Sequence, residues 1–341
     1  MKKGQSHFST RRRAVSEDAV VKTIGGLAVQ SGACRSGIQL GIGDDAALLR
    51  AAGARDEILT CDWFLEGTHF LRDKHSPDSV GWKCLARAVS DVAAMGGVPR
   101  CFLLSIALPA ANTGHWLDQF LVGLRRASKR FGCSLVGGDT TRRNEILINV
   151  TVVGEVRRGR AVLRSQARPG DVLFVSGRLG EAELGLELIR KSSKPVDRRN
   201  PILQKHLYPE PRLELGRWLA DRRLASAMMD LSDGLSSDLS RLAKASGVGA
   251  LVEAVKIPAV RMPKEWHRRG ALALELALHG GDDYELLFTV PCRKSKLIPR
   301  SFKGVHITAI GEITKGTDIV LIDKNGRVST MANRGWDPFR Q

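Results

Sequence analysis

Two adjacent aspartates, set between glycines and an apolar run, constrain this chain more than any other feature. Asp44 and Asp45 follow Gly41-Ile42-Gly43 and precede the apolar residues 46–49. Neighbouring carboxylates repel each other, and both adjoin a segment that favours burial. A divalent cation such as Mg²⁺ would resolve this conflict, because it takes hard oxygen ligands. The alternative is a Gly-Asp turn whose side chains stay in water.

The combination of glycine and aspartate recurs along the chain. It returns at Gly137-Gly138-Asp139, at Asp230-Leu231-Ser232-Asp233-Gly234 and at Gly280-Gly281-Asp282-Asp283, and single acids stand among small or apolar residues at Asp62 and Asp91. The chain as a whole is basic, with 53 Lys and Arg residues against 36 Asp and Glu residues. Acidic motifs in an otherwise positive chain predict at least one shared metal cluster.

Length and composition favour a globular protein with two domains. The chain has 341 residues, of which 43% are apolar and 26% charged. Its six cysteines are scattered without a C-x-x-C pair, which argues against zinc and a disulfide framework and for a reducing compartment. No run reaches the length of a membrane span, and no apolar signal-peptide core begins the sequence. We therefore expect a cytoplasmic protein without a membrane partner.

The net charge of +17 permits two interpretations. It is compatible with a nucleic-acid partner, and it would also attract anionic substrates. The basic residues are dispersed in pairs rather than gathered in one block, and aromatic residues make up only 5% of the chain. Nucleic-acid binding is therefore kept only as a lesser alternative.

The hydrophobic patterns predict an α+β fold whose two halves vary one plan. Helices are predicted over 16–30, 78–95, 113–131, 179–191, 212–221, 235–245 and 272–279, and strands over 46–49, 57–62, 101–108, 146–156, 171–176, 227–230, 251–253, 286–290, 306–310 and 319–323. Residues 32–37 and 192–211 are predicted to be loops. A basic connector at 157–170 marks the domain boundary, which gives domains 1–157 and 158–341. Each half places its glycine–aspartate motifs at strand ends.

Several catalytic motifs are absent. The sequence has no P-loop, no H-E-x-x-H, no G-x-S-x-G and no protein-kinase signature. The segment from Gly41 to Ala46 faintly resembles a dinucleotide fingerprint, but Asp44 and Asp45 would repel a pyrophosphate. Many carboxylates, a glycine-rich backbone and scattered arginines instead suit phosphoryl transfer, in which Mg²⁺ neutralises the phosphates.

Five motifs taken together resemble the thiamine-monophosphate kinase family, which belongs to the superfamily of aminoimidazole-ribonucleotide synthetase and selenophosphate synthetase. They are Gly-Ile-Gly-Asp-Asp-Ala, Ser-Asp-Val-Ala-Ala-Met-Gly, Gly-Gly-Asp-Thr-Thr, Asp-Leu-Ser-Asp-Gly-Leu and Gly-Gly-Asp-Asp-Tyr-Glu-Leu. The resemblance extends in order from Gly41 to Trp336. It implies that ATP phosphorylates thiamine monophosphate to thiamine diphosphate by direct transfer, with several Mg²⁺ ions. Another ATP-using enzyme of the superfamily, with a different substrate, is the alternative.

The resemblance also implies a fold and a set of site residues. The fold is a two-domain synthetase-like one, with N-terminal strands that form a barrel shared by a homodimer and a C-terminal α/β sandwich domain. Metal positions are matched by Asp45, Thr60, Cys61, Asp62, Asp91, Asp139, Asp230 and Asp233. ATP contacts are matched by Gly138, Asp139, Arg164 and Ser232, and substrate contacts by His69, Asp282 and Trp336. No side chain is expected to be a covalent or acid–base catalyst.

Three features depart from the family pattern. Cys61 stands where a threonine ligand is usual, and because a neutral thiol is a poor Mg²⁺ ligand, only its backbone carbonyl would serve. Asp282 stands where glutamate is usual, so its reach is shorter by one methylene. The basic extension over residues 1–13 is atypical, although none of these departures removes an essential carboxylate.

Each site residue also has a plainer interpretation. His69 would be a solvated loop residue, Arg164 a surface arginine, Ser232 the cap of the next helix, and Trp336 a cover for the edge of the C-terminal core. These alternatives stay open at the level of sequence.

Four further residues near the motifs are left outside the site. Asp238 is expected to face solvent on its helix, Tyr284 and Glu285 to be structural, and Asp44 to support the metal ligands without touching the ion.

Overall fold

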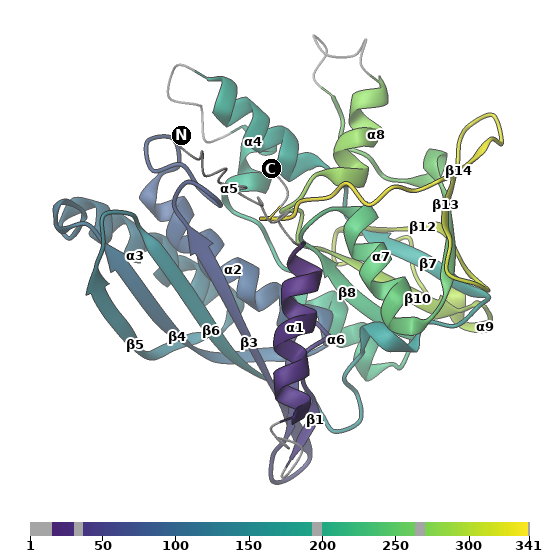
Figure 1. Ribbon diagram of the computed structural model, residues 1–341, viewed down its shortest axis with the longest axis horizontal. Helices are drawn as coiled ribbons and strands as arrows, with labels where there is room; N and C mark the ends of the chain where they lie inside the picture. Colours follow the sequence, from purple (N-terminus) through teal and green to yellow (C-terminus); the bar gives the residue numbers. More distant parts are fainter. Residues whose placement is uncertain (1–15, 31–36, 193–199, 263–269, 340–341) are drawn as a thin grey trace, which may run out of the picture.

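The computed structural model describes residues 16–30, 37–192, 200–262 and 270–339, and it divides into two halves, each built on a sheet (Figure 1). The basic extension over residues 1–13 lies outside this described part, and the two predicted loops lie partly outside it. The first helix, α1 (Glu17–Gln30), stands in front of the junction between the halves in Figure 1.

The first half is a six-stranded sheet with helices on one face. Its strands are β1 (Ile38–Leu40), β2 (Ala47–Arg50), β3 (Arg55–Leu65), β4 (Val98–Leu108), β5 (Ser134–Arg142) and β6 (Leu147–Arg157), in the order β1-β2-β3-β6-β4-β5. All neighbours are antiparallel except β4 and β5. The helices α2 (Pro77–Ala94) and α3 (His115–Phe131) supply the other half of its hydrophobic core, and the short η1 (Ala110–Asn112) precedes α3.

Two glycines let α2 and α3 cross in close contact. A Cβ atom on Gly81 would lie 2.1 Å from the carbonyl oxygen of Phe120, and one on Gly123 would lie 1.8 Å from that of Asp78. Because no side chain larger than hydrogen fits at either position, the two helices are held tightly together. This contact fixes α2 in the middle of the molecule, where it carries part of the candidate site.

The opposite face of this sheet is open along β3, β4 and β5. Every residue of β5 is exposed, and two large apolar side chains stand on the open face, Trp63 at 55% exposed and Leu103 at 43%. No element among the described residues covers them. Neither of the two sheets closes into a barrel within the described part of the chain.

The second half is an eight-stranded sheet. Its strands are β7 (Asp171–Ser176), β8 (Ala227–Leu231), β9 (Gly249–Glu253), β10 (Glu285–Pro291), β11 (Ser301–Phe302), β12 (Val305–Thr314), β13 (Ile319–Ile322) and β14 (Val328–Thr330). The order is β14-β13-β9-β12-β7-β10-β8, and β11 pairs with β12. All pairs are antiparallel except β9 with β13.

Helices cover both faces of this second sheet. They are α4 (Glu181–Lys191), α5 (Pro201–Leu207), α6 (Leu213–Asp221), α7 (Leu235–Ser246), α8 (Gly270–His279) and α9 (Cys292–Ser295), with the short η2 (Arg164–Gln166) and η3 (Ala254–Lys256). Successive residues of a strand point to opposite faces. Thus Met229 packs in the cluster with α7, whereas Met228 packs in the cluster with α6 and with Ala94 at the end of α2. The end of α2 therefore joins the two halves.

Two sequence predictions are corrected by the fold. The segment 192–211, predicted to be a loop, contains α5, because Asn200 caps it by accepting the backbone N–H of Ile202 and Pro201 occupies the first turn, where proline is tolerated. The strand β5 continues through Gly137-Gly138-Asp139, so this motif does not mark a strand end. No helix in the described ranges is long and apolar enough to cross a membrane.

Candidate active site

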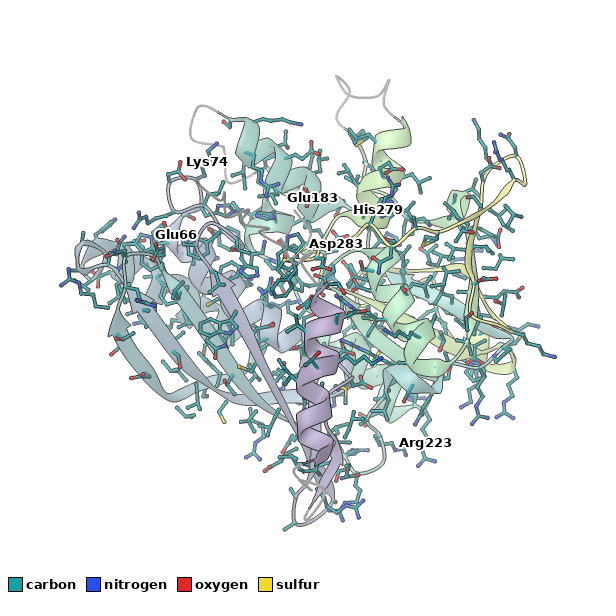
Figure 2. All side chains as sticks on the ribbon, viewed as in Figure 1. Glu66, Lys74, Glu183, Arg223, His279 and Asp283 are labelled. Carbon is teal, nitrogen blue, oxygen red and sulfur yellow. The ribbon has the colours of Figure 1, made fainter. Side chains whose placement is uncertain are left out.

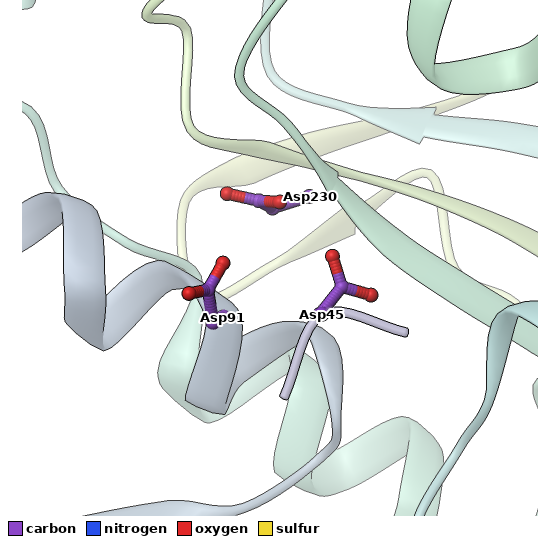
Figure 3. Close-up of side chains that lie close together, drawn as sticks. All are labelled: Asp45, Asp91 and Asp230. Carbon is purple, nitrogen blue, oxygen red and sulfur yellow. The ribbon is translucent and has the colours of Figure 1, made fainter. Parts of the chain in front are cut away.

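Three aspartates from distant parts of the chain converge where the two halves meet. Asp45 follows the turn at Gly43, whose φ of 128° favours glycine, Asp91 lies near the end of α2, and Asp230 lies near the end of β8. Their carboxylate oxygens lie within 4.8 Å of one another (Figure 3). The three residues form what we call the acid cluster.

Electrostatic repulsion makes the acid cluster unfavourable without a cation. Burial and the neighbouring carboxylates of Asp62 and Asp230 raise the pKa of Asp91 well above its usual range. Burial and Asp45 raise the pKa of Asp230 in the same way. Carboxylates crowded in this manner favour a shared proton or a bound cation. The donor set consists entirely of hard oxygen atoms and fits a divalent metal ion such as Mg²⁺.

Arg164 is the nearest cation to the acid cluster in this structure. Its Nε atom donates to Asp45 Oδ2 at 3.0 Å, and its Nη2 atom reaches Oδ1 of the same carboxylate. Asp44 braces the arrangement, because it accepts the backbone N–H groups of Asp45 and Arg164, both at 3.0 Å. Burial and the charge of Asp45 raise the pKa of Asp44 to about 6. Arg164 is thus part of the site and not a free surface arginine.

The strand β3 presents alternate residues to the acid cluster. Thr60 donates its hydroxyl to Asp91 Oδ2, and Asp62, whose pKa is raised by burial, is a further neighbour of Asp91. Between them, the Cys61 side chain points to the opposite face, where its sulfur lies 3.3 Å from Asn149 Oδ1. The thiol is therefore directed away from the cluster, in keeping with a role for the Cys61 carbonyl alone.

The turn between β8 and α7 is held by a buried aspartate. Asp238 accepts the backbone N–H groups of Ser232 and Asp233, both at 3.1 Å, and has no exposed surface. The expectation that Asp238 faces solvent is wrong, because the turn needs an acceptor for these two amides. Nor does Ser232 cap α7, since the N-cap residue is Gly234 and no side chain bonds there. Arg241 pairs with the carboxylate of Asp233.

A cavity of about 400 Å³ lies beside the acid cluster and brings together the three predicted substrate residues. His69, Asp282 and Trp336 all line it, together with Ser232 and Asp233. The rings of His69 and Trp336 have centroids 5.6 Å apart, and the backbone N–H of Trp336 donates to Asp233 O at 3.0 Å. The C-terminal segment is thereby tied to the turn after β8.

Titratable side chains from two helices also line the cavity. Glu183 of α4 and His279 of α8 both line it, and Figure 2 shows them around the region where the two halves meet. Asp283, also marked in Figure 2, is turned away to the start of α4, where its carboxylate accepts the N–H groups of Gly180 and Ala182.

His69 provides an uncharged aromatic surface in this cavity. Its Nδ1 atom accepts the backbone N–H of Leu65 at 2.9 Å, and its ring stacks on Phe64 with centroids 5.7 Å apart. Burial, together with the nearby charge of Arg87, lowers the pKa of His69 to about 3. The ring is therefore neutral at physiological pH and largely enclosed, which differs from a solvated loop histidine.

Asp282 is held in place by two hydrogen-bonding side chains. Lys83 Nζ lies 2.8 Å from Asp282 Oδ2, and the Tyr284 hydroxyl donates to Oδ1 at 2.6 Å. Burial alone would raise the pKa of Asp282, but Lys83, His206 and Arg87 hold it well below its usual range. Asp282 and Tyr284 also have φ values of 68° and 49°, which are uncommon for residues other than glycine. Such backbone geometry often accompanies a functional site.

Glu285 belongs to the framework around the cavity. Its buried carboxylate pairs with Arg212 and accepts the Ser176 hydroxyl at 2.5 Å.

Two predicted ATP-site residues lie apart from this assembly. Gly138 and Asp139 belong to the exposed strand β5, where Asp139 pairs in register with Ser105 and its side chain accepts the N–H of Thr140. Neither residue lines the cavity, and among the described residues the acid cluster does not include Asp139. A Cβ atom at Gly138 would meet Leu104 O at 1.8 Å, so glycine is required there to pair the strands.

Sequence reasoning missed two basic residues of the site. Lys83 and Arg87 lie on α2, eight and four residues before Asp91, and all three project from one stripe of the helix. The spacing of four was visible in the sequence, but a lysine and an arginine in a helix ordinarily face solvent. Burial of Lys83 and the pairing of Arg87 with the Tyr284 hydroxyl at 3.1 Å depend on the second half of the chain.

Comparison with known proteins places both halves in one family. Residues 43–156 match the family described as AIR synthase related protein, N-terminal domain, and residues 168–324 match its C-terminal domain. The chain is 34% identical to the thiamine-monophosphate kinase of Bacillus subtilis over 312 residues, which covers 89% of this chain and 95% of that protein. It is 36% identical to the thiamine-monophosphate kinase of Escherichia coli K12, covering 89% and 93%.

Solved structures give the same result at the level of the fold. The structure described as AaThiL complexed with AMPPCP and TMP has a TM-score of 0.82 at 33% identity and covers 97% of this chain and 100% of that one. The hydrogenase maturation protein HypE in complex with ATP has a TM-score of 0.68 at 20% identity, covering 86% of this chain and 89% of that one. At that identity the likeness to HypE concerns the fold alone.

Proposed function

This chain belongs to the thiamine-monophosphate kinase family, with the two domains described for AIR synthase related proteins, and on that premise we propose its reaction and the roles of its residues. The protein transfers the γ-phosphate of ATP to thiamine monophosphate, which yields ADP and thiamine diphosphate. The observation that carries this conclusion is its match to AaThiL complexed with AMPPCP and TMP, over the full length of that chain.

The acid cluster is the proposed site of Mg²⁺. Asp45, Asp91 and Asp230 would hold the ion, because the surrounding protein does not supply enough positive charge to neutralise their crowded carboxylates. Thr60, Asp62 and Asp233 lie around the cluster and are proposed as further ligands, with the carbonyl of Cys61. When bound, Mg²⁺ supplies positive charge that screens the phosphates of the donor and the acceptor.

Arg164 and Ser232 are proposed to contact ATP. The guanidinium of Arg164 already lies on Asp45, and its planar fork suits two phosphate oxygens as well as two carboxylate oxygens. Gly138 and Asp139 remain proposed ATP and metal contacts from the family motif. Because both residues lie on the exposed edge strand β5, this role requires another molecule, such as a second copy of the chain, to pack against β5.

The cavity suits the shape and charge of thiamine. His69 and Trp336 offer aromatic rings to a flat, cationic ligand, and Asp282 contributes negative charge nearby. No side chain has to act as a nucleophile or general base, because phosphoryl transfer depends mainly on positioning and on charge.

A homodimer is proposed from the open face of the first sheet. Trp63 and Leu103 form an apolar patch there, and β5 is an exposed edge of nine residues. Exposed sheet edges and apolar patches of this kind favour association. A second copy set against this face would cover it, and the strands of both copies would form the barrel expected from the family.

Two further expectations stay proposals. We place the division between the domains after Arg157, where β6 ends, which gives residues 1–157 and 158–341. The cytoplasmic location expected from the scattered cysteines is the other.

A direct assay tests the proposed function. Purified protein with ATP, Mg²⁺ and thiamine monophosphate should form thiamine diphosphate and ADP in equal amounts, as measured by chromatography. ADP without thiamine diphosphate would support a different acceptor within the superfamily. A salt-dependent gel shift with duplex and single-stranded DNA examines the lesser alternative, nucleic-acid binding.

A further inference from the structure

Arg87 is a largely buried arginine whose hydrogen-bonding capacity is mostly unused. It lines the cavity from α2, and 16% of its side chain is exposed. A guanidinium has five N–H donors. Among the described residues, the only hydrogen bond of Arg87 is from Nη1 to the Tyr284 hydroxyl at 3.1 Å, and its buried Nε has no partner.

The position of Arg87 connects the aromatic wall of the cavity with the carboxylates. The rings follow one another with centroid distances of 5.6 Å from Trp336 to His69 and 5.7 Å from His69 to Phe64. The guanidinium carbon of Arg87 then lies 5.7 Å from the centre of the Phe64 ring, and Nη2 lies 4.0 Å from Asp62 Oδ1. Phe64 is buried and does not line the cavity, whereas Arg87 does and Asp62 does not. A ligand that stacks on Trp336 and His69 therefore reaches Arg87 before it reaches Asp62.

The charge of Arg87 is not neutralised by a close ion pair. Its nearest acids are Asp282, at 3.6 Å from Nη1, and Asp62, and both distances exceed that of a hydrogen bond. Asp282 has both oxygens engaged, by Lys83 and by the Tyr284 hydroxyl. It therefore orients Arg87 through Tyr284 and leaves the guanidinium edge available to a ligand.

The other cations of the cavity are less suited to an anion at its inner end. Arg334 is already paired with Glu275 at 3.0 Å and lies 2.9 Å from His279. Lys83 is fully buried behind Asp282. Arg190 lines the cavity but is exposed to solvent, so its field is screened.

We propose that Arg87 binds the phosphate of thiamine monophosphate and sets the preference of the site for phosphorylated over unphosphorylated thiamine. This inference rests on the proposed function and deepens it. A phosphate monoester carries between one and two negative charges near neutral pH and must approach Asp62 and the acid cluster. Arg87 counters that repulsion at the place where the acceptor meets the carboxylates, and its fork can hold two phosphate oxygens.

The third phosphate oxygen is then the one that reacts. It forms a bond to the γ-phosphorus of ATP as the bond between that phosphorus and the β,γ-bridging oxygen breaks. ADP leaves with the bridging oxygen and its electron pair. Arg87 acts in this step by orienting the acceptor and by lowering the repulsion between two anions.

The test compares binding of thiamine monophosphate and thiamine without ATP, in Mg²⁺ buffer, by isothermal titration calorimetry. Arg87→Met removes the charge and the fork, and Arg190→Met removes the same charge from the rim of the same cavity as a matched control. In wild type we expect clearly tighter binding of the phosphate ester. In Arg87→Met that preference should fall about 10- to 100-fold, the effect of one or two charged hydrogen bonds. Thiamine affinity should stay within about twofold, and Arg190→Met should keep the preference.

Each other outcome has a defined meaning. An unchanged preference in folded Arg87→Met overturns the proposal. An equal loss in Arg190→Met also overturns it, because the preference would then come from the general positive charge of the cavity and not from a contact with Arg87. If Arg87→Met fails to fold, Arg87→Gln, which removes the charge but keeps a hydrogen-bond donor, decides the question by the same ratio. If wild type itself neither prefers thiamine monophosphate nor forms thiamine diphosphate, the proposed function fails, independently of Arg87.

Discussion

Arg164 and Asp45, 119 positions apart in the sequence, join the two halves of the molecule through a forked ion pair inside the candidate metal site. The pair places the protein's own cation on a carboxylate that a metal ion would also use. Arg164 and Mg²⁺ should therefore compete for Asp45, and the competition gives a first prediction.

In Arg164→Ala, Mg²⁺ should stabilise the protein more than it stabilises wild type. Without metal, the variant should melt at a lower temperature, because a buried carboxylate loses its partner, at a cost of about 3–5 kcal/mol. Addition of Mg²⁺ should recover most of the loss, and the KM for ATP should rise. Thermal melts with and without Mg²⁺ measure the difference, and an equal metal-induced shift in both proteins would contradict the competition.

Removal of single carboxylate charges should sharply reduce turnover. Asp62→Asn, Asp139→Asn and Asp233→Asn each remove a charge that is predicted to face metal and phosphate, and we expect kcat to fall about 100-fold or more in each. Circular dichroism serves as the control for folding. Near-normal kcat in all three variants at saturating Mg²⁺ would refute a shared metal site, and normal kcat in Asp139→Asn alone would remove that residue from it.

Trp336→Ala should weaken binding of thiamine monophosphate and leave ATP binding intact. The ring is 40% exposed, so its loss removes little core packing. A cation over an aromatic ring contributes roughly 0.5–2 kcal/mol, and the upper end of this range corresponds to a rise in KM of about tenfold. Steady-state kinetics with each substrate varied in turn provide the measurement. A collapse in melting temperature would instead favour the role of Trp336 as a cover for the core.

Stability should fall in acid in part because of His69. Burial lowers the folded-state pKa of His69 to about 3, against an ordinary value of about 6.5, so the unfolded chain binds a proton that the folded chain excludes. The contribution is complete above pH 6.5 and is lost as the pH falls, by about 2 kcal/mol at pH 5. His69→Phe keeps an aromatic ring and should flatten this part of the profile. Urea melts from pH 7.5 to 5 test this, and parallel profiles for the two proteins would contradict it.

A charge on the open sheet face should separate the proposed dimer. Trp63→Arg places a cation in the apolar patch, where association would bury it, and should give a monomer in light scattering at micromolar concentration. Val255→Arg is the control, because Val255 is also exposed, at 66%, but lies on the other half of the chain. A wild-type protein that is monomeric and active would refute the dimer.

The motifs predicted the acid cluster because each acid is fixed by local sequence. Asp45 follows a turn that needs Gly43, and Asp230 ends a strand of apolar residues, so their places depend little on the rest of the chain. Asp91 required a helix, which its hydrophobic pattern predicts. The recurring motifs predicted a shared cluster, but which acids belong to it was implied only by the resemblance, since sequence alone does not fix how two halves pack.

Other features were not predictable in the same way. Asp238 has the pattern of an exposed helix residue, yet it is buried because the turn just before its helix directs the amides of Ser232 and Asp233 onto its carboxylate. The strand β5 continues through two glycines because β4 pairs with it, which overrides their local preference to turn. The prolines in segment 192–211 favour a loop, but Pro201 lies in the first turn of α5, where proline is tolerated.

The helix α2 fixes the spacing between two parts of the proposed site. Arg87 and Asp91 are separated by one turn of a single helix, about 6 Å along its axis. In the proposed complex, the gap between the acceptor phosphate at Arg87 and the acid cluster is therefore set by backbone hydrogen bonds and not by loops. The helix is itself clamped at Gly81 and Gly123. A larger side chain at Gly81 or Gly123 would displace Arg87 and Asp91 together, because both lie on α2. A substitution there would therefore change the selection of the acceptor and the affinity for the metal at the same time.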